Sequence, residues 1–193
     1  MEPAAHTAHD GGELNRHCVL DHADISRAVR RMSHEIVEHH RGTAGLLILG
    51  IPTRGVFLAS RIAQLIGSIE GQPPALGSLD ITMYRDDLRL RPARALEPTS
   101  IPDCGVDEQH VVLVDDVLFS GRTVRAALDA LADLGRPATV QLAVLVDRGH
   151  RQLPIRPDYV GKNLPTALGQ QVRVELGEID GIDCVSVHGA VAG

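Results

Sequence analysis

Aromatic side chains are scarce in this chain of 193 residues: tryptophan is absent, and tyrosine and phenylalanine together make up 2% of the sequence. So few rings exclude an aromatic platform on which successive bases of single-stranded nucleic acid would stack. Cysteine is also rare. The three cysteines are an odd number without metal-ligand spacing, which predicts reduced thiols in a cytoplasmic protein and not a disulfide scaffold.

The chain also lacks a long apolar run and an excess of positive charge. No segment approaches the length of a membrane span and the N-terminus has no apolar signal segment, so we expect a cytoplasmic protein without membrane contact. The formal net charge of −6 argues against bulk attraction to nucleic acid or anionic lipid. A local basic patch is still compatible with that net charge.

The segments that are present alternate between helix and strand patterns. Residues 1–16 are polar and predict a disordered tail, and residues 17–193 suit a single domain with a full core. Helical periodicity predicts helices over residues 24–41, 53–67 and 121–135. Apolar runs predict strands over residues 45–51, 76–83, 110–116 and 139–146; an irregular run follows over 147–166, with two short strands near 171–176 and 184–188. This alternation predicts an α/β fold with a central, mainly parallel sheet flanked by helices.

The stretch from Val111 to Thr123, with the sequence VVLVDDVLFSGRT, carries the strongest functional signal. Its first four residues predict a buried strand, and two adjacent carboxylates, Asp115 and Asp116, follow directly. Ligands of α/β sheets bind beyond the carboxyl ends of strands, and helix N-termini favour phosphate. The stretch therefore offers carboxylates for a sugar diol and, close by, N–H groups and hydroxyls for a phosphate. A ribose 5-phosphate suits both.

A second junction between strand and helix has the sequence GIPTRG at residues 50–55. Its glycines let backbone N–H groups approach a ligand closely, and Arg54 is suited to phosphate oxygens. A cis peptide would cost least at Ile51–Pro52, although the sequence does not say which bond is cis. Taken alone, this junction fits an ordinary strand–turn–helix corner as well as a ligand loop.

A long segment over residues 84–109 shows no clear period and is rich in arginine, with Arg85, Arg89, Arg91 and Arg94. Loops of this length inside a compact domain are uncommon and usually functional. For any single arginine, a solvated loop position is as good an explanation as a ligand contact.

VVLVDDVLFSGRT resembles the 5-phosphoribosyl-1-pyrophosphate (PRPP) signature of the type I phosphoribosyltransferases. The resemblance implies the type I fold, with a flexible flap over about 84–109 and a small C-terminal hood over about 147–193. It implies that Mg²⁺ is carried by PRPP without direct protein ligands, and that Asp115, Asp116 and Arg85 take part in catalysis. The other contacts it implies for PRPP or nucleotide are Thr53, Arg54, Arg94, Val117, Leu118, Phe119, Ser120, Gly121, Arg122 and Thr123.

The run LAVLVDRGHRQLPIRPDYVGKNLPT, with ITMYRDDL and GIPTRG upstream, resembles the PyrR family of pyrimidine operon attenuators that also act as uracil phosphoribosyltransferases. The resemblance covers Leu20 to about Leu176 and implies that uracil binds near Arg148 and Val172. Pro52 is unusual in its loop. Phe119-Ser120 stands where relatives often have Tyr-Thr, and Ser120 keeps the hydroxyl that the resemblance assigns to phosphate binding.

Regulation of the PyrR type requires RNA, which an acidic chain must bind through a local patch. Arg27, Arg30, Arg31 and His34 fall at i, i+3, i+4 and i+7 and so share one helix face. By resemblance, Arg151 and Arg156 join this patch. A basic helix face is more often only solvated, so the resemblance carries this prediction. A homodimer, with a higher oligomer left open, would double the patch for a folded mRNA leader.

We therefore predict a regulator of pyrimidine genes that binds pyr mRNA in dependence on uridine nucleotides and also converts uracil and PRPP to UMP and pyrophosphate. One alternative is a plain uracil salvage enzyme without an RNA role. Another is a non-catalytic RNA-binding regulator that senses nucleotides through the PRPP motif. A purine or orotate enzyme on the same core is the weakest alternative.

Overall fold

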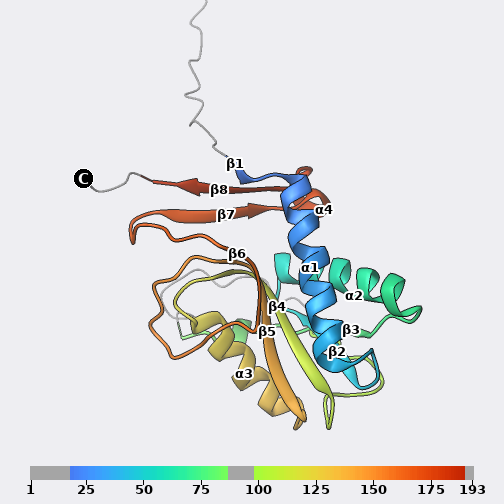
Figure 1. Cartoon of the computed structure of the whole chain (residues 1–193). Helices are drawn as coiled ribbons and strands as arrows, with labels where there is room; N and C mark the ends of the chain where they lie inside the picture. The colour runs from blue at the N-terminus through green and yellow to red at the C-terminus, as the bar shows by residue number, and fades with distance from the viewer. Residues whose placement is uncertain (1–17, 87–97, 190–193) are drawn as a thin grey trace, which may run out of the picture.

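The computed structural model describes residues 18–86 and 98–189, which form two sheets (Figure 1). The larger sheet has five parallel strands in the order β3-β2-β4-β5-β6. Their bounds are β2 (Leu46–Gly50), β3 (Ala75–Ser78), β4 (His110–Leu118), β5 (Thr139–Asp147) and β6 (Tyr159–Asn163). The smaller, antiparallel sheet, here called the hood sheet, is made of β1 (Cys18–Leu20), β8 (Cys184–His188) and β7 (Gln171–Glu175). The predicted α/β class with a parallel central sheet is confirmed.

Helices cover both faces of the parallel sheet (Figure 1). The helices α1 (His22–His40) and α2 (Arg54–Glu70) pack on one face, and α3 (Arg122–Leu134) packs on the other. Successive side chains of a strand point to opposite faces, so Leu46 and Ile48 of β2 join one core while Leu47 and Leu49 join the other. Because both faces are covered, β2 and the central stretches of β4 and β5 are continuous apolar runs and do not alternate with polar residues.

The first helix shows how local sequence fixes an element boundary. The Asp21 carboxylate accepts a hydrogen bond from the N–H of Asp24 at 2.8 Å, and the Asp24 carboxylate accepts one from the N–H of Asp21 at 3.2 Å. This capping box satisfies two N–H groups that the first turn leaves unpaired, so the helix begins at His22, two residues before the predicted start.

Two predictions about strands are wrong. Residues 159–163 lie in the run predicted to be irregular, but they form β6, because β5 offers a free edge to a short strand whose sequence has no apolar run. The strand predicted over 76–83 ends at Ser78 and is followed by a 3₁₀ turn, η1 (Thr82–Tyr84).

The prediction of reduced cysteines is also wrong for two of the three. Cys18 in β1 and Cys184 in β8 are joined by a disulfide, with their Cα atoms 5.8 Å apart, whereas Cys104 is free and exposed. The two partners are separated by 166 residues, so only the antiparallel pairing of β1 with β8 brings them together.

The hood sheet lies beyond the carboxyl end of β4, where a short helix, α4 (Gly177–Asp180), connects β7 to β8. Within residues 18–86 and 98–189, no helix has both the length and the apolar character needed to cross a membrane. The predicted tail and most of the arginines in the predicted flap fall outside the described residues.

Candidate active site

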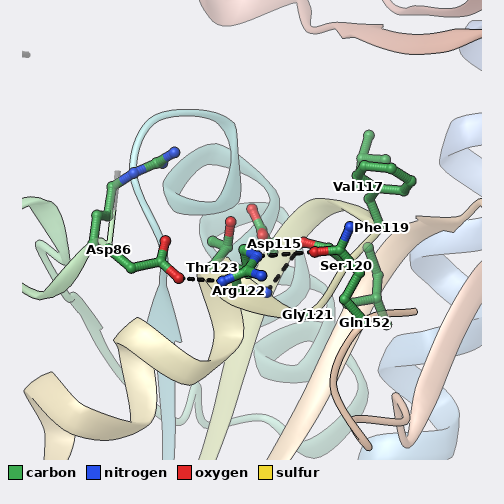
Figure 2. Close-up of a pocket in the computed structure, with 11 residues that line it drawn as sticks. Asp86, Asp115, Val117, Phe119, Ser120, Gly121, Arg122, Thr123 and Gln152 are labelled. Atoms are coloured by element: carbon green, nitrogen blue, oxygen red, sulfur yellow. Dashed lines mark hydrogen bonds and ion pairs between the residues drawn. The ribbon is translucent and has the colours of Figure 1, made fainter. Parts of the chain in front are cut away.

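The end of β4, the following loop and the start of α3 enclose a first cavity of about 310 Å³ (Figure 2). All seven predicted nucleotide-contact residues from Val117 to Thr123 line it, together with Asp115 and Arg85. Gly121 caps α3 with a left-handed backbone, φ 91°, which glycine adopts without steric cost. The N-terminus of a helix of 13 residues thus opens into the first cavity, and such a terminus favours an anion.

The two adjacent aspartates serve different cavities. Asp115 lines the first cavity, whereas Asp116 lines a second cavity of about 460 Å³ below the hood sheet, here called the hood cavity. Each carboxylate is held by the next backbone N–H: Asp115 accepts from Asp116 at 2.9 Å, and Asp116 accepts from Val117 at 2.7 Å. Consecutive strand residues point to opposite sides, which explains how one dipeptide serves both cavities.

Asp115 is buried, with only 7% of its residue surface exposed. Burial is the main reason why the pKa of Asp115 lies well above the ordinary value of 3.8, and the nearby charge of Asp116 raises the pKa further. The N–H of Asp116 and the charge of Arg85 act in the opposite direction. Asp115 therefore holds its proton to a higher pH than an exposed carboxyl group does, and a protonated carboxyl can donate as well as accept a hydrogen bond.

The raised pKa of Asp115 predicts how Asp115→Asn changes stability with pH. A carboxyl whose pKa is raised by folding stabilises the fold fully below its unfolded pKa and loses that contribution as pH rises through the folded pKa. The asparagine side chain would keep the acceptor for the Asp116 N–H and cannot ionise. We expect the thermal midpoint of the variant, relative to that of the wild type, to rise as the pH is raised from 4 to 8.

Thermal melts of both proteins between pH 4 and pH 8 measure this difference. Asp129→Asn, on the exposed side of α3, is the control for loss of a carboxylate. A difference for Asp115→Asn that stays constant across this range would contradict the assignment.

The hood cavity brings together residues that lie far apart in the sequence. Arg54 and Asp116 line it from the side of the parallel sheet, and the hood sheet contributes Gln171, Val172, Arg173, Val174 and His188. Of the hood residues, sequence analysis named only Val172. The others depend on the register of β7 with β8, which pairs Gln171 with His188, and no local signal in the sequence gives that register.

The GIPTRG junction forms the start of α2, with Arg54 as its first residue. A cis peptide is present, but it lies at Pro52–Thr53, one bond after the position where it would cost least. The Arg54 guanidinium makes a bidentate ion pair with Asp180 of α4, in which Nη2 and Oδ1 are 2.9 Å apart. Sequence analysis missed Asp180, which lies 126 residues away along the chain.

The described start of the predicted flap is tied to α3. The Tyr84 hydroxyl donates to Asp133 at 2.6 Å, and Asp86 forms an ion pair with Arg122. Figure 2 shows Arg122 between Asp86 and Gln152, to whose Oε1 the Arg122 Nε donates at 3.0 Å. These contacts hold Arg85 at the first cavity. Arg94 lies outside the described residues.

Arg148 lines neither of the two cavities. It is 7% exposed, its guanidinium carbon lies 4.3 Å from the centre of the Phe119 ring, and its Nη2 donates to the carbonyl of Gln170 at 2.6 Å. Its Nε donates to Thr166. Arg148 therefore braces the loop after β6 against Phe119, while Val172 is the predicted uracil residue that faces the hood cavity.

The predicted RNA residues fall into two groups. Arg27, Arg30, Arg31 and His34 are all exposed on α1, although Arg31 also donates to the carbonyls of Val160 and Gly161 in β6. Arg156 is exposed as well. Arg151 is largely committed within the protein, because it donates to the carbonyls of Phe119 and Ile155 and pairs with Asp147.

The residues that the structure describes contain no cluster of three or more histidine, cysteine or acidic side chains able to hold a metal ion. The carboxylates of Asp115 and Asp116 nevertheless offer hard oxygen ligands beside the two cavities. Carboxylate oxygens of this kind fit a Mg²⁺ ion.

The model of the family described as "Phosphoribosyl transferase domain" matches residues 17–176. A protein of Streptomyces coelicolor described as "Bifunctional protein PyrR" is 64% identical over 167 residues, which cover 86% of either chain. The chain belongs to the PyrR family. Another PyrR-family protein, from Mycobacterium ulcerans, is 54% identical over 188 residues and covers 95% of this chain and 98% of its own. The predicted family is confirmed.

Two hypoxanthine phosphoribosyltransferases of low sequence identity are among the solved structures that resemble this PyrR-family chain. The hypoxanthine phosphoribosyltransferase of Trypanosoma cruzi superposes with a TM-score of 0.67 at 15% identity, covering 88% of this chain and 94% of that one. That of Staphylococcus aureus gives a TM-score of 0.60 at 17% identity over 79% and 80% of the two chains. At such identities the likeness concerns the fold alone, and it confirms the predicted type I fold.

Proposed function

We propose that this PyrR-family protein has two activities. It converts uracil and PRPP to UMP and pyrophosphate, and it binds pyr mRNA in dependence on uridine nucleotides to regulate pyrimidine genes. The observation that carries the proposal is the Asp115-Asp116 pair, which serves the loop-lined first cavity on one side and the hood cavity on the other. Membership in the PyrR family supports both activities over the salvage-only and non-catalytic alternatives.

In this proposal the first cavity binds the ribose 5-phosphate. Residues Val117 to Thr123 surround the phosphate with backbone N–H groups, two hydroxyls and the positive end of α3. Asp115 and Asp116 hold the ribose hydroxyls. Arg54 and Arg85 neutralise the pyrophosphate and Thr53 binds it by hydrogen bonding, with Arg94 as a further candidate from outside the described residues. Mg²⁺ bound with PRPP supplies additional positive charge to the pyrophosphate oxygens.

The reaction needs positioning and electrostatics, with no covalent nucleophile. A uracil nitrogen attacks C1 of the ribose as the bond from C1 to the pyrophosphate oxygen breaks, and positive charge develops on the sugar ring. The Asp116 carboxylate stabilises that charge from the hood cavity, where uracil lies against Val172 and backbone groups of β7. Arg148 acts indirectly, by bracing Phe119 and the loop after β6.

The test of the enzymatic half is UMP formation from uracil and PRPP with Mg²⁺, with orotate, hypoxanthine and guanine as alternative bases. Turnover with uracil alone is the expected result. Turnover with orotate or a purine would assign a different acceptor. No turnover with any base, in a folded protein that binds UMP, would favour the non-catalytic regulator.

The RNA half assigns the exposed arginines of α1 and Arg156 to phosphate contacts on the mRNA leader. We expect Arg30→Ala combined with Arg156→Ala to weaken RNA binding about tenfold at physiological salt and to reduce its salt dependence, because two phosphate contacts are lost. Arg151 is left unchanged because its loss would also disturb Phe119 in the first cavity.

Affinity for the pyr mRNA leader, measured over a range of salt concentrations, tests this assignment. The double variant Arg125→Ala/Arg136→Ala removes two exposed arginines, one in α3 and one just after it, and is the control for loss of the same charge. Unchanged affinity of the double variant would show that the patch lies elsewhere. Equal affinity with and without UMP would refute coupling between the nucleotide site and RNA. A cytoplasmic homodimer, which would double the patch, is part of the proposal.

A further inference from the structure

The guanidinium of Arg54 is held by a carboxylate that reaches it from the hood. Arg54 Nη2 lies 2.9 Å from Asp180 Oδ1 and 3.1 Å from Oδ2, and Nε lies 3.3 Å from Oδ2. The side chains are 29% and 16% exposed. A bidentate contact of this kind fixes the plane of the guanidinium as well as its position.

Asp180 is itself fixed by a backbone N–H at the start of α4. Its Oδ2 accepts a hydrogen bond from the N–H of Leu176 at 2.9 Å, at the start of α4. This N–H is the main reason why the pKa of Asp180 lies below its ordinary value, and the Arg54 charge lowers it further. The carboxylate is therefore ionised and has little freedom to leave Arg54.

A separate ion pair network anchors α4 to α2. Arg61 binds Glu178 at 2.6 Å and Asp183 at 2.7 Å, on the side of α4 away from the hood cavity. The position of α4 thus does not depend on Asp180 alone. A change at Asp180 can alter Arg54 while the helix keeps its place.

The contact with Asp180 uses one edge of the guanidinium. Arg54 Nη1 makes no hydrogen bond within residues 18–86 and 98–189, and the Arg54 side chain lines the hood cavity together with Asp116. A long arginine side chain loses much rotamer entropy when it binds a ligand, and a side chain already held in place loses less.

We propose that Asp180 is a positioning residue for PRPP: it fixes Arg54 by the Nε–Nη2 edge so that Nη1 is presented to the pyrophosphate group. The inference rests on the proposed role of Arg54 and adds to it a residue from the hood. The hood then contributes to PRPP binding as well as to binding of the base.

Steady-state kinetics of Asp180→Asn test this role. Asparagine keeps the shape and the acceptor for the Leu176 N–H but removes the charge that holds Arg54. We expect KM for PRPP to rise about tenfold, while KM for uracil and kcat stay within about twofold. An Arg54 side chain that is no longer fixed in place weakens binding of PRPP in the ground state and in the transition state to the same extent. Glu178→Gln, on the same helix but paired with Arg61, is the control and leaves KM for PRPP unchanged.

The single variant Arg54→Ala and the double variant Arg54→Ala/Asp180→Asn distinguish a wrong role for Arg54 from a wrong role for Asp180. If Asp180 acts through Arg54, adding Asp180→Asn to Arg54→Ala changes KM for PRPP no further. A normal KM in Arg54→Ala overturns the proposed role of Arg54 and this inference with it. A raised KM in Arg54→Ala with a normal KM in Asp180→Asn overturns positioning alone. A lowered KM in Asp180→Asn would mean that Asp180 competes with pyrophosphate for Arg54 and would overturn positioning as well. Asp180→Ser serves the same test if the asparagine variant does not fold.

Discussion

Asp116→Asn is expected to lower the turnover of uracil and PRPP about 100-fold, the size of effect produced by removing one electrostatic stabiliser of a transition state. The substitution takes a negative charge from the position where the sugar ring becomes positive. It keeps the size of the side chain and the oxygen that accepts a hydrogen bond from the Val117 N–H at 2.7 Å. The fold should therefore survive, and the loss should appear in kcat.

Measurement of kcat for UMP formation, beside a thermal melt, tests the expectation. Asp129→Asn removes an exposed carboxylate of α3 and should leave kcat unchanged. If Asp116→Asn turned over as fast as the wild type, the charge of Asp116 would have no part in the chemistry.

Gly55→Ala is expected to destabilise the fold by about 3 kcal/mol, at the upper end of the usual cost of overpacking. A Cβ at position 55 would lie 2.3 Å from the carbonyl oxygen of Val114 and 3.2 Å from the Cα of Asp115. Both neighbours are backbone atoms of β4, so the start of α2 must move away from the sheet. A loss of this size in a chain of about 190 residues lowers the thermal midpoint by about 10 °C.

Gly169→Ala is the matched control for that variant. A Cβ at position 169 meets nothing within 4 Å, and the residue does not have a left-handed backbone. Its thermal midpoint should change by about 2 °C or less. Equal midpoints for the two variants would mean that α2 can move from β4 without cost.

The parts of the site that lie close together in the sequence could be predicted from it. A buried strand, two carboxylates and a helix start lie within the span from Val111 to Thr123, so the covalent chain itself places them at the same end of the sheet. The division of Asp115 and Asp116 between two cavities follows from the strand period. Sequence analysis, which gave the two aspartates one role, did not use that period.

Contacts between distant segments could not be predicted. Asp180 reaches Arg54 through the placement of α4. His188 and Gln152 reach the cavities through the register of β8 and the course of the loop after β5. No local pattern encodes these arrangements. Arg148 and Arg151 have the charge that suits ligands, but the structure uses both mainly as internal braces, and residue type alone does not distinguish the two uses.

The pairing of β1 with β8 determines the order in which the two sheets can form while the chain is being synthesised. The parallel sheet and the loop proposed to bind phosphate are complete once Asn163 has been made. The hood sheet must wait for His188, because its first strand, at Cys18, pairs with the last. Domains of a growing chain fold from the N-terminal side as they emerge, yet here β1 has no strand partner until β8 has been made. A nascent chain released after β6 would carry the PRPP loop without the strands that cover it.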